Sequence, residues 1–450
     1  MPDIARRLIK NTLFNFLGRF VSRLANFFLV PYILHKIGIG EFGLFSLLNV
    51  FFYFANLADL GTGTSIVRFI TADLARSDME SLGRRVFGQL LFCFAITILL
   101  AAVLEALGSI TLGFFHLAAS DLVRMHCLVV TFIIAMGIGC IANVFQSILL
   151  GYQRMDLTNA IGIILVLPNV VGTVLLLQMG FGLEGLVWVF FGVQVLGLIL
   201  TWIVADRVCP QLHWAQRWPD KTGFVQTVHL GLQAQWVRIV STFSRTLDQI
   251  LLAPMMGLSA VTTYALASKP VLLIQEAGAL IVSATVPVVA HLDTQNSQLD
   301  KQRIGKLLRR SQRYIDLFVG VALCGFLALS GFLVRAWLGP EYSNVSGVMK
   351  LLACGHLVSL LTAPGINELM GKGNMTMLAP ILTVQIISQI FLSWWFIKVI
   401  GLLGPAIALC TAVGYGTLHF LIVFYRSRTM SLPGAERRGN PVVIASRSLH

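Results

Sequence analysis

The chain has 450 residues, of which 56% are hydrophobic and 12% are charged, and its mean hydropathy is +0.81. Soluble globular domains carry about 25% charged residues, so this composition excludes a soluble protein and predicts one that crosses the membrane many times. The formal net charge is +13, and the positions of the basic residues decide whether it indicates a nucleic-acid partner.

Apolar runs long enough to cross about 30 Å of hydrocarbon, roughly 20 residues each, recur along the chain and predict about twelve membrane-spanning helices. The first run is interpreted as a retained span and not a signal peptide, because Arg19 and Arg23 interrupt it and no small-residue cleavage site follows. The expected fold class is therefore an all-α polytopic membrane protein. The predicted spans cover approximately residues 12–34, 42–70, 86–108, 122–150, 158–179, 183–205, 226–256, 260–290, 314–336, 345–370, 375–397 and 403–425.

Most of the 33 basic residues fall between spans on one side of the predicted membrane. With the N-terminus in the cytoplasm, that side holds the basic segments 301–313 and 426–447, and the C-terminus is cytoplasmic too. The positive-inside rule thus explains the net charge. We expect contacts with membrane lipids and no nucleic-acid partner.

The two halves of the chain resemble each other at a nearly constant offset. Ser22-Arg23-Leu24 matches Ser244-Arg245-Thr246, and Ala58-Asp59-Leu60-Gly61 matches Gln275-Glu276-Ala277-Gly278. Each half contains an even number of predicted spans, so the repeats are parallel and predict two six-helix lobes with a cleft between them. In this repeat Arg23 and Arg245 are equivalent positions.

The predicted lobes cover residues 1–206 and 226–426, joined by a cytoplasmic linker at 207–225 and followed by a cytoplasmic tail at 427–450. Within the second lobe, apolar residues of segment 293–313 are spaced for one helical face, with basic residues on the other. This pattern indicates an amphipathic helix on the cytoplasmic leaflet. A charged loop that obeys the positive-inside rule is the alternative.

Four arginines lie inside predicted spans, where each charge costs about 2.5 to 3.5 kcal/mol on insertion scales. The members of each pair share a helical face, and we interpret them as substrate-binding residues of a cationic cavity between the lobes. Ser244 and Asp248 are expected to extend the polar face of the second pair. The alternative is that the arginines are structural and are neutralised by acidic residues. The two pairs are Arg19 with Arg23 and Arg238 with Arg245.

Three acidic residues inside spans are assigned either to pairing with these arginines or to binding a coupling proton or cation. They are Asp59, Asp248 and Glu276. Arg68 and Lys269 are possible additional cavity residues. Arg124, near the outer end of its span, is expected to extend to the lipid headgroups.

No motif for catalysis or cofactor binding is found. Gly38–Gly43 fits G-x-G-x-x-G, but it joins two spans with no preceding strand, so a dinucleotide fold is not expected. The sequence contains no Walker A and no H-E-x-x-H motif, and its seven cysteines are scattered without a C-x-x-C. We expect no catalytic residue, metal or cofactor.

Several short motifs together resemble the polysaccharide flippase branch of the multidrug/oligosaccharidyl-lipid/polysaccharide (MOP) exporter superfamily. They are Val30-Pro31-Tyr32-Ile33-Leu34, Glu41-Phe42-Gly43-Leu44, Asp59-Leu60-Gly61 and Gly151-Tyr152-Gln153-Arg154. The resemblance implies an alternating-access protein of the cell inner membrane. The implied cargo is an undecaprenyl-diphosphate-linked oligosaccharide, moved to the outer face for O-antigen or exopolysaccharide synthesis. Polymerase or chain-length machinery is the implied protein partner.

Two other functions stay open at this point. An ion-coupled exporter of small drugs would share the fold, but its cationic substrates fit a basic cavity poorly. A membrane enzyme acting on lipid-linked sugars would need a long outer loop with catalytic groups, whereas the predicted outer loops are short.

Overall fold

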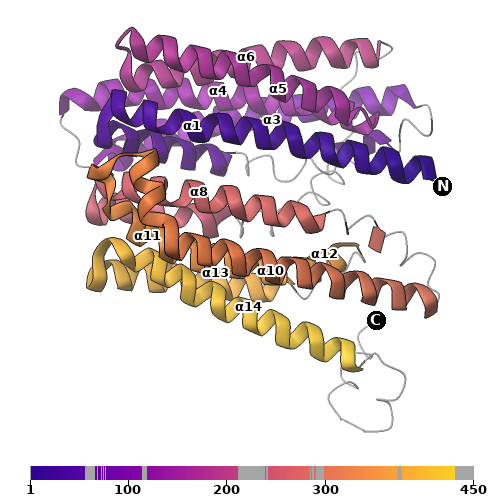
Figure 1. Cartoon of the computed structure of the whole chain (residues 1–450). Helices are drawn as coiled ribbons and strands as arrows, with labels where there is room; N and C mark the ends of the chain where they lie inside the picture. Colours follow the sequence, from indigo (N-terminus) through magenta and orange to yellow (C-terminus); the bar gives the residue numbers. More distant parts are fainter. Residues whose placement is uncertain are drawn as a thin grey trace.

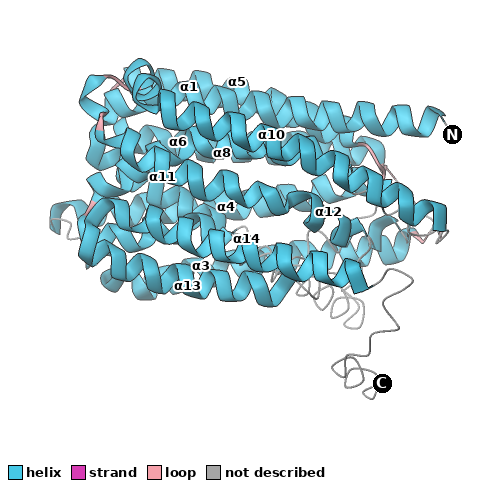
Figure 2. Cartoon of the chain, turned by 60° about the horizontal axis from the view of Figure 1, so that its bottom comes forward, coloured by secondary structure: helices cyan, strands magenta, loops and turns pink. Residues whose placement is uncertain are grey.

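The computed structural model describes residues 2–55, 66–67, 69–71, 73, 76, 78–113, 119–210, 239, 242–283, 285, 288–289, 298–371 and 378–430. These residues form helices without any strand (Figure 2). The helices of the first lobe are α1 (Pro2–Ala55), α3 (Met79–Gly113), α4 (Ala119–Gly151), α5 (Met155–Gln178) and α6 (Gly182–Val208). The second lobe contains a helix at 242–256, α8 (Leu258–Ser283), α10 (Gln298–Trp337), α11 (Asn344–Ser359), α12 (Ala363–Gly371), α13 (Leu378–Ile400) and α14 (Gly404–Met430), with short 3-10 turns between some of them.

Nine segments among the described residues are long and apolar enough to cross a membrane. Some of these segments hold two predicted spans, because α1 contains the first span and the start of the second, and Pro380–Phe424 contains the last two. Each of the twelve predicted spans therefore falls, wholly or in part, on a described helix. The all-α, polytopic fold class is confirmed.

The two spans within α1 are separated by a bend at Gly38, which has φ 80° and ψ 172°. A positive φ is accessible to glycine because it has no Cβ. The bend marks one end of the bundle, here called the Gly38 end. Helix α1 begins, and α14 ends, at the opposite end (Figure 1), as an even number of crossings requires.

The two lobes form two layers of helices that meet along α1 and α8 (Figure 1). One hydrophobic cluster crosses this boundary, since Leu34 and Phe42 of α1 are buried together with Val261 and Leu266 of α8. The lobes are thus joined by apolar packing at the base of the site described below.

Helix α10 is a single helix of 40 residues, about 60 Å at 1.5 Å per residue, so it extends beyond the hydrocarbon. It runs beside α8 and α11 along the bundle (Figure 2). From residue 298 on, the predicted amphipathic segment 293–313 is the start of this helix. Ile304 and Leu308 are buried, and Leu308 packs in one cluster with Leu369 of α12. The charged loop was therefore wrong from residue 298 on, since the segment is helical there and its apolar face contacts protein. Its place on the cytoplasmic leaflet stays a prediction.

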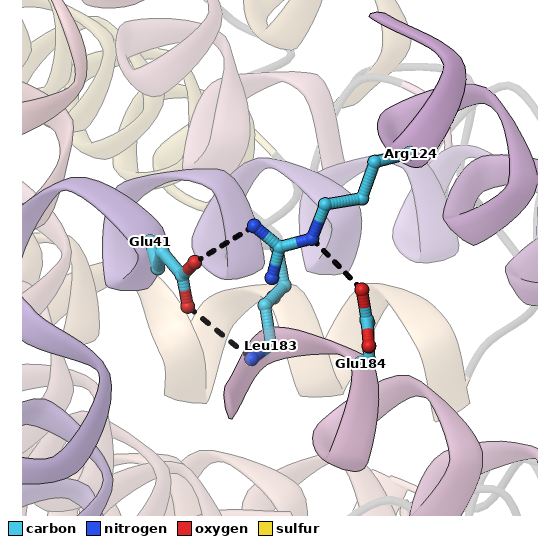
Figure 3. A network of polar contacts seen from close by, with 4 residues as sticks. All are labelled: Glu41, Arg124, Leu183 and Glu184. Atoms are coloured by element: carbon cyan, nitrogen blue, oxygen red, sulfur yellow. Dashed lines mark hydrogen bonds and ion pairs between the residues drawn. The ribbon is translucent and has the colours of Figure 1, made fainter. Parts of the chain in front are cut away.

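Arg124 forms a network at the Gly38 end of the first lobe (Figure 3). Its Nη1 lies 3.2 Å from Oε1 of Glu41, and its Nε donates to Oε1 of Glu184 at 2.8 Å. The backbone N–H of Leu183 donates to the other oxygen of Glu41 at 3.3 Å. Two carboxylates from neighbouring helices thus hold the guanidinium of Arg124, and these partners were not predicted from the sequence. Its extension to the lipid headgroups stays a prediction.

Candidate functional site

A cavity of about 810 Å³ lies between the two lobes. Helices α1, α4, α5 and α6 line it from the first lobe, and the helix at 242–256 and α8 line it from the second. Its polar lining includes Arg23, Asn26, Ser46, Asn49, Asn169, Thr173, Gln194, Thr242, Arg245, Thr246, Gln249, Ser268, Lys269 and Glu276. The cavity therefore lies where the repeat predicted a cleft.

Charges from both lobes meet at Glu276. Arg23 of α1 forms an ion pair with this carboxylate across the lobe boundary. On the other side, Nη1 of Arg245 lies 4.0 Å from Oε1 of Glu276. The side chains of Arg23 and Arg245 are 50% and 48% exposed, and that of Glu276 is 23% exposed. The two arginines that the repeat made equivalent thus share one carboxylate in a solvated cavity.

Neighbouring residues fix the orientation of α8 around Glu276. Gln275 donates from Nε2 to the carbonyl oxygen of His356 at 3.0 Å and to Oγ of Ser359 at 2.9 Å, which ties α8 to α11. At Gly278, an added Cβ would lie 2.7 Å from side-chain atoms of Leu360 and Phe318. Because these two positions face the interior of the second lobe, Glu276 projects into the cavity.

Lys269 lines the same cavity seven residues before Glu276 on α8. Two helical turns separate the two positions by about 10 Å, with Lys269 nearer the Gly38 end. Its Nζ lies 5.8 Å from the ring centroid of Phe42, within range of a cation–π interaction. Within the described lining, Arg23, Arg245 and Lys269 carry positive charge and Glu276 carries negative charge, so this part of the cavity is cationic.

Asp248 does not line this cavity. It is 1% exposed and accepts hydrogen bonds from the Tyr264 hydroxyl, from Ser393 Oγ at 2.8 Å and from Gln389 Nε2 at 3.4 Å. These partners, within the described part of the chain, are uncharged. Ser244 likewise donates to Oε1 of Gln389 at 2.7 Å.

The expectation that Ser244 and Asp248 extend the cavity-facing polar face was therefore wrong. The helix at 242–256 has two polar faces, and only the one that carries Arg245 and Gln249 lines the cavity. Hydrogen bonds to α13 of the same lobe hold the other face. Neutralisation of Arg245 thus comes from Glu276 on α8.

Several predicted site residues lie outside the described residues. They are Arg68, Asp59 and Arg238, together with the side chain of Arg19, whose backbone belongs to α1. In the residues that the structure describes, no cluster of three metal-ligating side chains is found.

The sequence matches the model of a family described as "Polysaccharide biosynthesis protein" over residues 8–293, which is more than half of the chain. The chain belongs to the polysaccharide biosynthesis protein family. No curated protein matches the sequence of this family member.

Solved membrane transporters share the fold of this chain. The lipid II flippase MurJ, in an inward closed conformation, is 16% identical with a TM-score of 0.72, over 91% of this chain and 87% of that one. An inward-facing multidrug resistance MATE family transporter of the MOP superfamily is 12% identical with a TM-score of 0.69, over 92% and 100%. A MATE transporter of Vibrio cholerae is 13% identical with a TM-score of 0.64, over 97% and 99%. The expected MOP-like fold is confirmed.

Contacts between the two lobes lie towards the Gly38 end of the cavity. Thr262 donates from Oγ1 to the carbonyl oxygen of Ile39 at 2.6 Å. At Gly43, an added Cβ would lie 2.4 Å from the carbonyl oxygen of Leu258, so the backbones of α1 and α8 touch. These contacts hold the lobes together at this end.

Sequence reasoning missed the residues that make these contacts. A hydroxyl at position 262 gives no periodic signal, because its acceptor belongs to the other lobe. Gly43 was noted as part of a glycine pattern and of a family motif, but not as a contact, although a glycine beside a span boundary is a signal for close backbone approach.

Proposed function

We propose that this protein flips an undecaprenyl-diphosphate-linked oligosaccharide from the cytoplasmic to the outer face of the inner membrane by alternating access. This transport would serve O-antigen or exopolysaccharide biosynthesis. The observation that carries the proposal is the cationic cavity between the lobes, to which one lobe contributes Arg23 and the other Arg245. Arginine matches the oxygens of phosphate groups in bidentate geometry, so such a cavity suits an anionic cargo.

The size of the cavity supports this cargo. A volume of about 810 Å³ lies within the range of roughly 300–1,000 Å³ that is usual for small-molecule sites. It can hold a diphosphate with its first sugars, while the polyprenyl tail stays in the surrounding lipid. An interior-negative membrane potential favours outward movement of each negative charge by about 2.3 kcal/mol per 100 mV.

The proposed cargo contacts are Arg23 and Arg245, together with Arg19 and Arg238. The spacing in the sequence predicts that Arg19 and Arg238 lie one or two turns away on the same helical faces. Lys269 adds a third cation to the described cavity wall. Arg68 is proposed as a further cavity residue on the basis of its place in the sequence. These groups would hold the diphosphate while the lobes change their relative tilt.

The proposed orientation places both termini in the cytoplasm. The exposed basic residues at the start of α10 lie at the same end of the bundle as the start of α1 (Figure 1). An excess of lysine and arginine on one side favours the cytoplasm. Polymerase or chain-length machinery is the proposed protein partner, and we place it at the outer face, where the flipped cargo would be released.

Asp248 is the proposed coupling residue, with Asp59 as a second candidate. A buried carboxylate whose described partners are all neutral hydrogen-bond donors is a position where binding a proton or a monovalent cation would change the local charge balance. If Asp248→Asn transported cargo in proteoliposomes with an unchanged response to imposed proton and sodium gradients, Asp248 would have no coupling role.

An ion-coupled multidrug exporter is the second candidate, because the fold is shared with MATE transporters. The sign of the cavity charge argues against it. A drug-hypersensitive strain that gained resistance on expression of this protein would favour the exporter. A membrane enzyme is a weaker candidate, and product formation from lipid-linked sugars by the purified chain would favour it.

The deciding experiment is complementation of a polysaccharide strain that lacks its flippase. The wild-type gene should restore surface polysaccharide, and a variant with alanine at Arg19, Arg23, Arg238 and Arg245 should not, at equal protein levels in the membrane. Arg335→Ala, at an exposed arginine of α10 away from the cavity lining, is the matched control. Full complementation by the fourfold variant would refute the proposed site, and failure of the wild type to transport any lipid-linked oligosaccharide in proteoliposomes would refute the function.

A further inference from the structure

The two arginines that we assign to the cargo are already in contact with a protein anion. Glu276 pairs with Arg23 of the first lobe, and its other oxygen lies 4.0 Å from Arg245 of the second lobe. Its carboxylate therefore occupies the position that a phosphate bound to both arginines would take.

We propose that Glu276 is a resident anion that cargo must displace, and that it restricts the cavity to lipids carrying more than one negative charge. This inference rests on the proposed function, because it concerns the selectivity of the same site. It assigns Glu276 a specificity-determining role that differs from simple neutralisation of the arginines.

The restriction follows from the exchange of charges. A phospholipid with a single phosphodiester brings one negative charge and displaces one, so it gains no net Coulombic energy from the arginine pair. A lipid diphosphate brings at least two charges, and the surplus is attracted by Lys269, about 10 Å further along the same face of α8. Phosphodiester lipids surround every membrane protein, so a cationic cavity without such a competitor would fill with them. In this way Glu276 competes with the abundant phosphodiester lipids for the arginines and excludes them, which makes the cavity selective.

The surroundings of Glu276 allow the exchange. The Glu276 side chain is 23% exposed and both arginine side chains are about half exposed, so water can solvate the displaced carboxylate. The backbone beneath it is fixed by the hydrogen bonds of Gln275 and the close packing of Gly278. Displacement therefore needs a change of side-chain rotamer and no movement of α8.

The same exchange links occupancy to the lobe boundary. The Arg23–Glu276 pair crosses from α1 to α8, so a cargo that replaces Glu276 removes one direct lobe–lobe contact and substitutes its own phosphates. The empty and loaded cavities consequently differ in what bridges the two lobes.

The test measures binding of undecaprenyl diphosphate to the purified full chain in nanodiscs, first in pure phosphatidylcholine and then with one third phosphatidylglycerol. Wild-type affinity should change less than about twofold between the two, since a monoanionic lipid competes poorly. In Glu276→Gln, phosphatidylglycerol should lower the affinity about tenfold, while the affinity in pure phosphatidylcholine should equal or exceed that of the wild type. Glu184→Gln, which removes a carboxylate paired with Arg124 outside the cavity, is the matched control and should behave as the wild type.

Glu276→Asp keeps the charge but withdraws it by one methylene, so phosphatidylglycerol should lower its affinity for undecaprenyl diphosphate by less than it does in Glu276→Gln. If Glu276→Gln does not fold, Glu276→Asp provides the test. Equal insensitivity of Glu276→Gln and wild type to phosphatidylglycerol would refute the inference and leave the proposed function standing. Weaker binding by Glu276→Gln in pure phosphatidylcholine would also refute it, because Glu276 would then orient the arginines. If the wild type bound no undecaprenyl diphosphate in either lipid, the proposed function itself would fail.

Discussion

The indole Nε1 of Trp337 donates a hydrogen bond to the carbonyl oxygen of Phe27 at 3.2 Å, across the boundary between the lobes. The two rings are also stacked, with centroids 4.3 Å apart and planes 3° from parallel. Pro31 lies four residues after Phe27 and has no N–H, so the carbonyl of Phe27 lacks its usual donor within α1. A proline in one lobe thus creates an acceptor that a tryptophan of the other lobe uses.

Trp337→Phe should keep the stacking and remove the donor, which leaves the Phe27 carbonyl without this partner. We expect a loss of about 1 kcal/mol in the free energy of unfolding. In a Pro31→Ala background the new N–H at residue 31 can donate to that carbonyl, so the same substitution should cost much less. Thermal unfolding of the four proteins of this cycle in one detergent checks the coupling, and an equal penalty in both backgrounds would contradict it.

Gly43→Ala should open the lobe boundary at the Gly38 end. The new methyl group would lie 2.4 Å from the carbonyl oxygen of Leu258, a backbone atom that cannot move aside by changing a rotamer. We expect greater labelling of a cysteine introduced at Thr262 by a membrane-impermeant maleimide. Gly40→Ala is the control, because nothing lies within 4 Å of a Cβ at that position; similar labelling in both variants would count against the tight contact.

Lys269→Gln should reduce transport more than it reduces stability. This side chain supplies a positive charge to the described cavity wall near the Gly38 end. We expect at least about a fivefold slower flipping rate, equivalent to about 1 kcal/mol for a partly solvated charge, and a nearly unchanged unfolding temperature. Lys398→Gln removes a lysine that lies 3.7 Å from the ring centroid of Trp394, and it should leave flipping unaffected. A wild-type rate in Lys269→Gln would exclude a role in cargo binding.

Arg85→Met should destabilise the protein in a pH-dependent way. Nε of Arg85 lies 3.0 Å from Oδ2 of Asp73, whose side chain is 6% exposed. Burial raises the pKa of Asp73, and the charge of Arg85 opposes the rise. Without Arg85, the pKa of Asp73 in the folded protein rises further above its value in the unfolded chain. The loss in the free energy of unfolding is therefore greatest above that folded-state pKa, and it fades at lower pH as the Asp73 carboxyl becomes protonated.

The expected loss for Arg85→Met is about 2–3 kcal/mol at pH 8 and clearly less at pH 5. Unfolding temperatures at the two pH values measure it. Arg84→Met is the matched control, since Arg84 pairs with the exposed Glu80 and its loss should be small at both values. A larger loss of stability at pH 5 than at pH 8 would contradict the predicted rise in the pKa of Asp73.

The spans and the class of fold were predictable because hydropathy is a local property of the sequence. The equivalence of Arg23 and Arg245 followed from the repeat, and both line the cavity. Their joint contact with Glu276 was not predictable, since it depends on how closely α1 and α8 approach. Asp248 and Arg245 are three residues apart on one helix, and only tertiary packing decides which of them faces the cavity.

For segment 293–313, too, the sequence did not predict the tertiary contacts. An amphipathic pattern with an apolar and a basic face is equally typical of a helix on a leaflet and of a helix that packs against protein. Ile304 and Leu308 pack against protein because α12 lies beside the start of α10. No local feature of the sequence of either helix predicts that they are neighbours.

Helix α10 carries exposed basic residues at one end and terminates at Trp337, the donor to Phe27, at the other. Since it is one uninterrupted rod, a tilt that lifts its basic end must swing Trp337 in the opposite direction. The basic end of α10 and the Trp337–Phe27 contact therefore cannot move independently, so a displacement at one end of this helix is transmitted to the lobe boundary near the other.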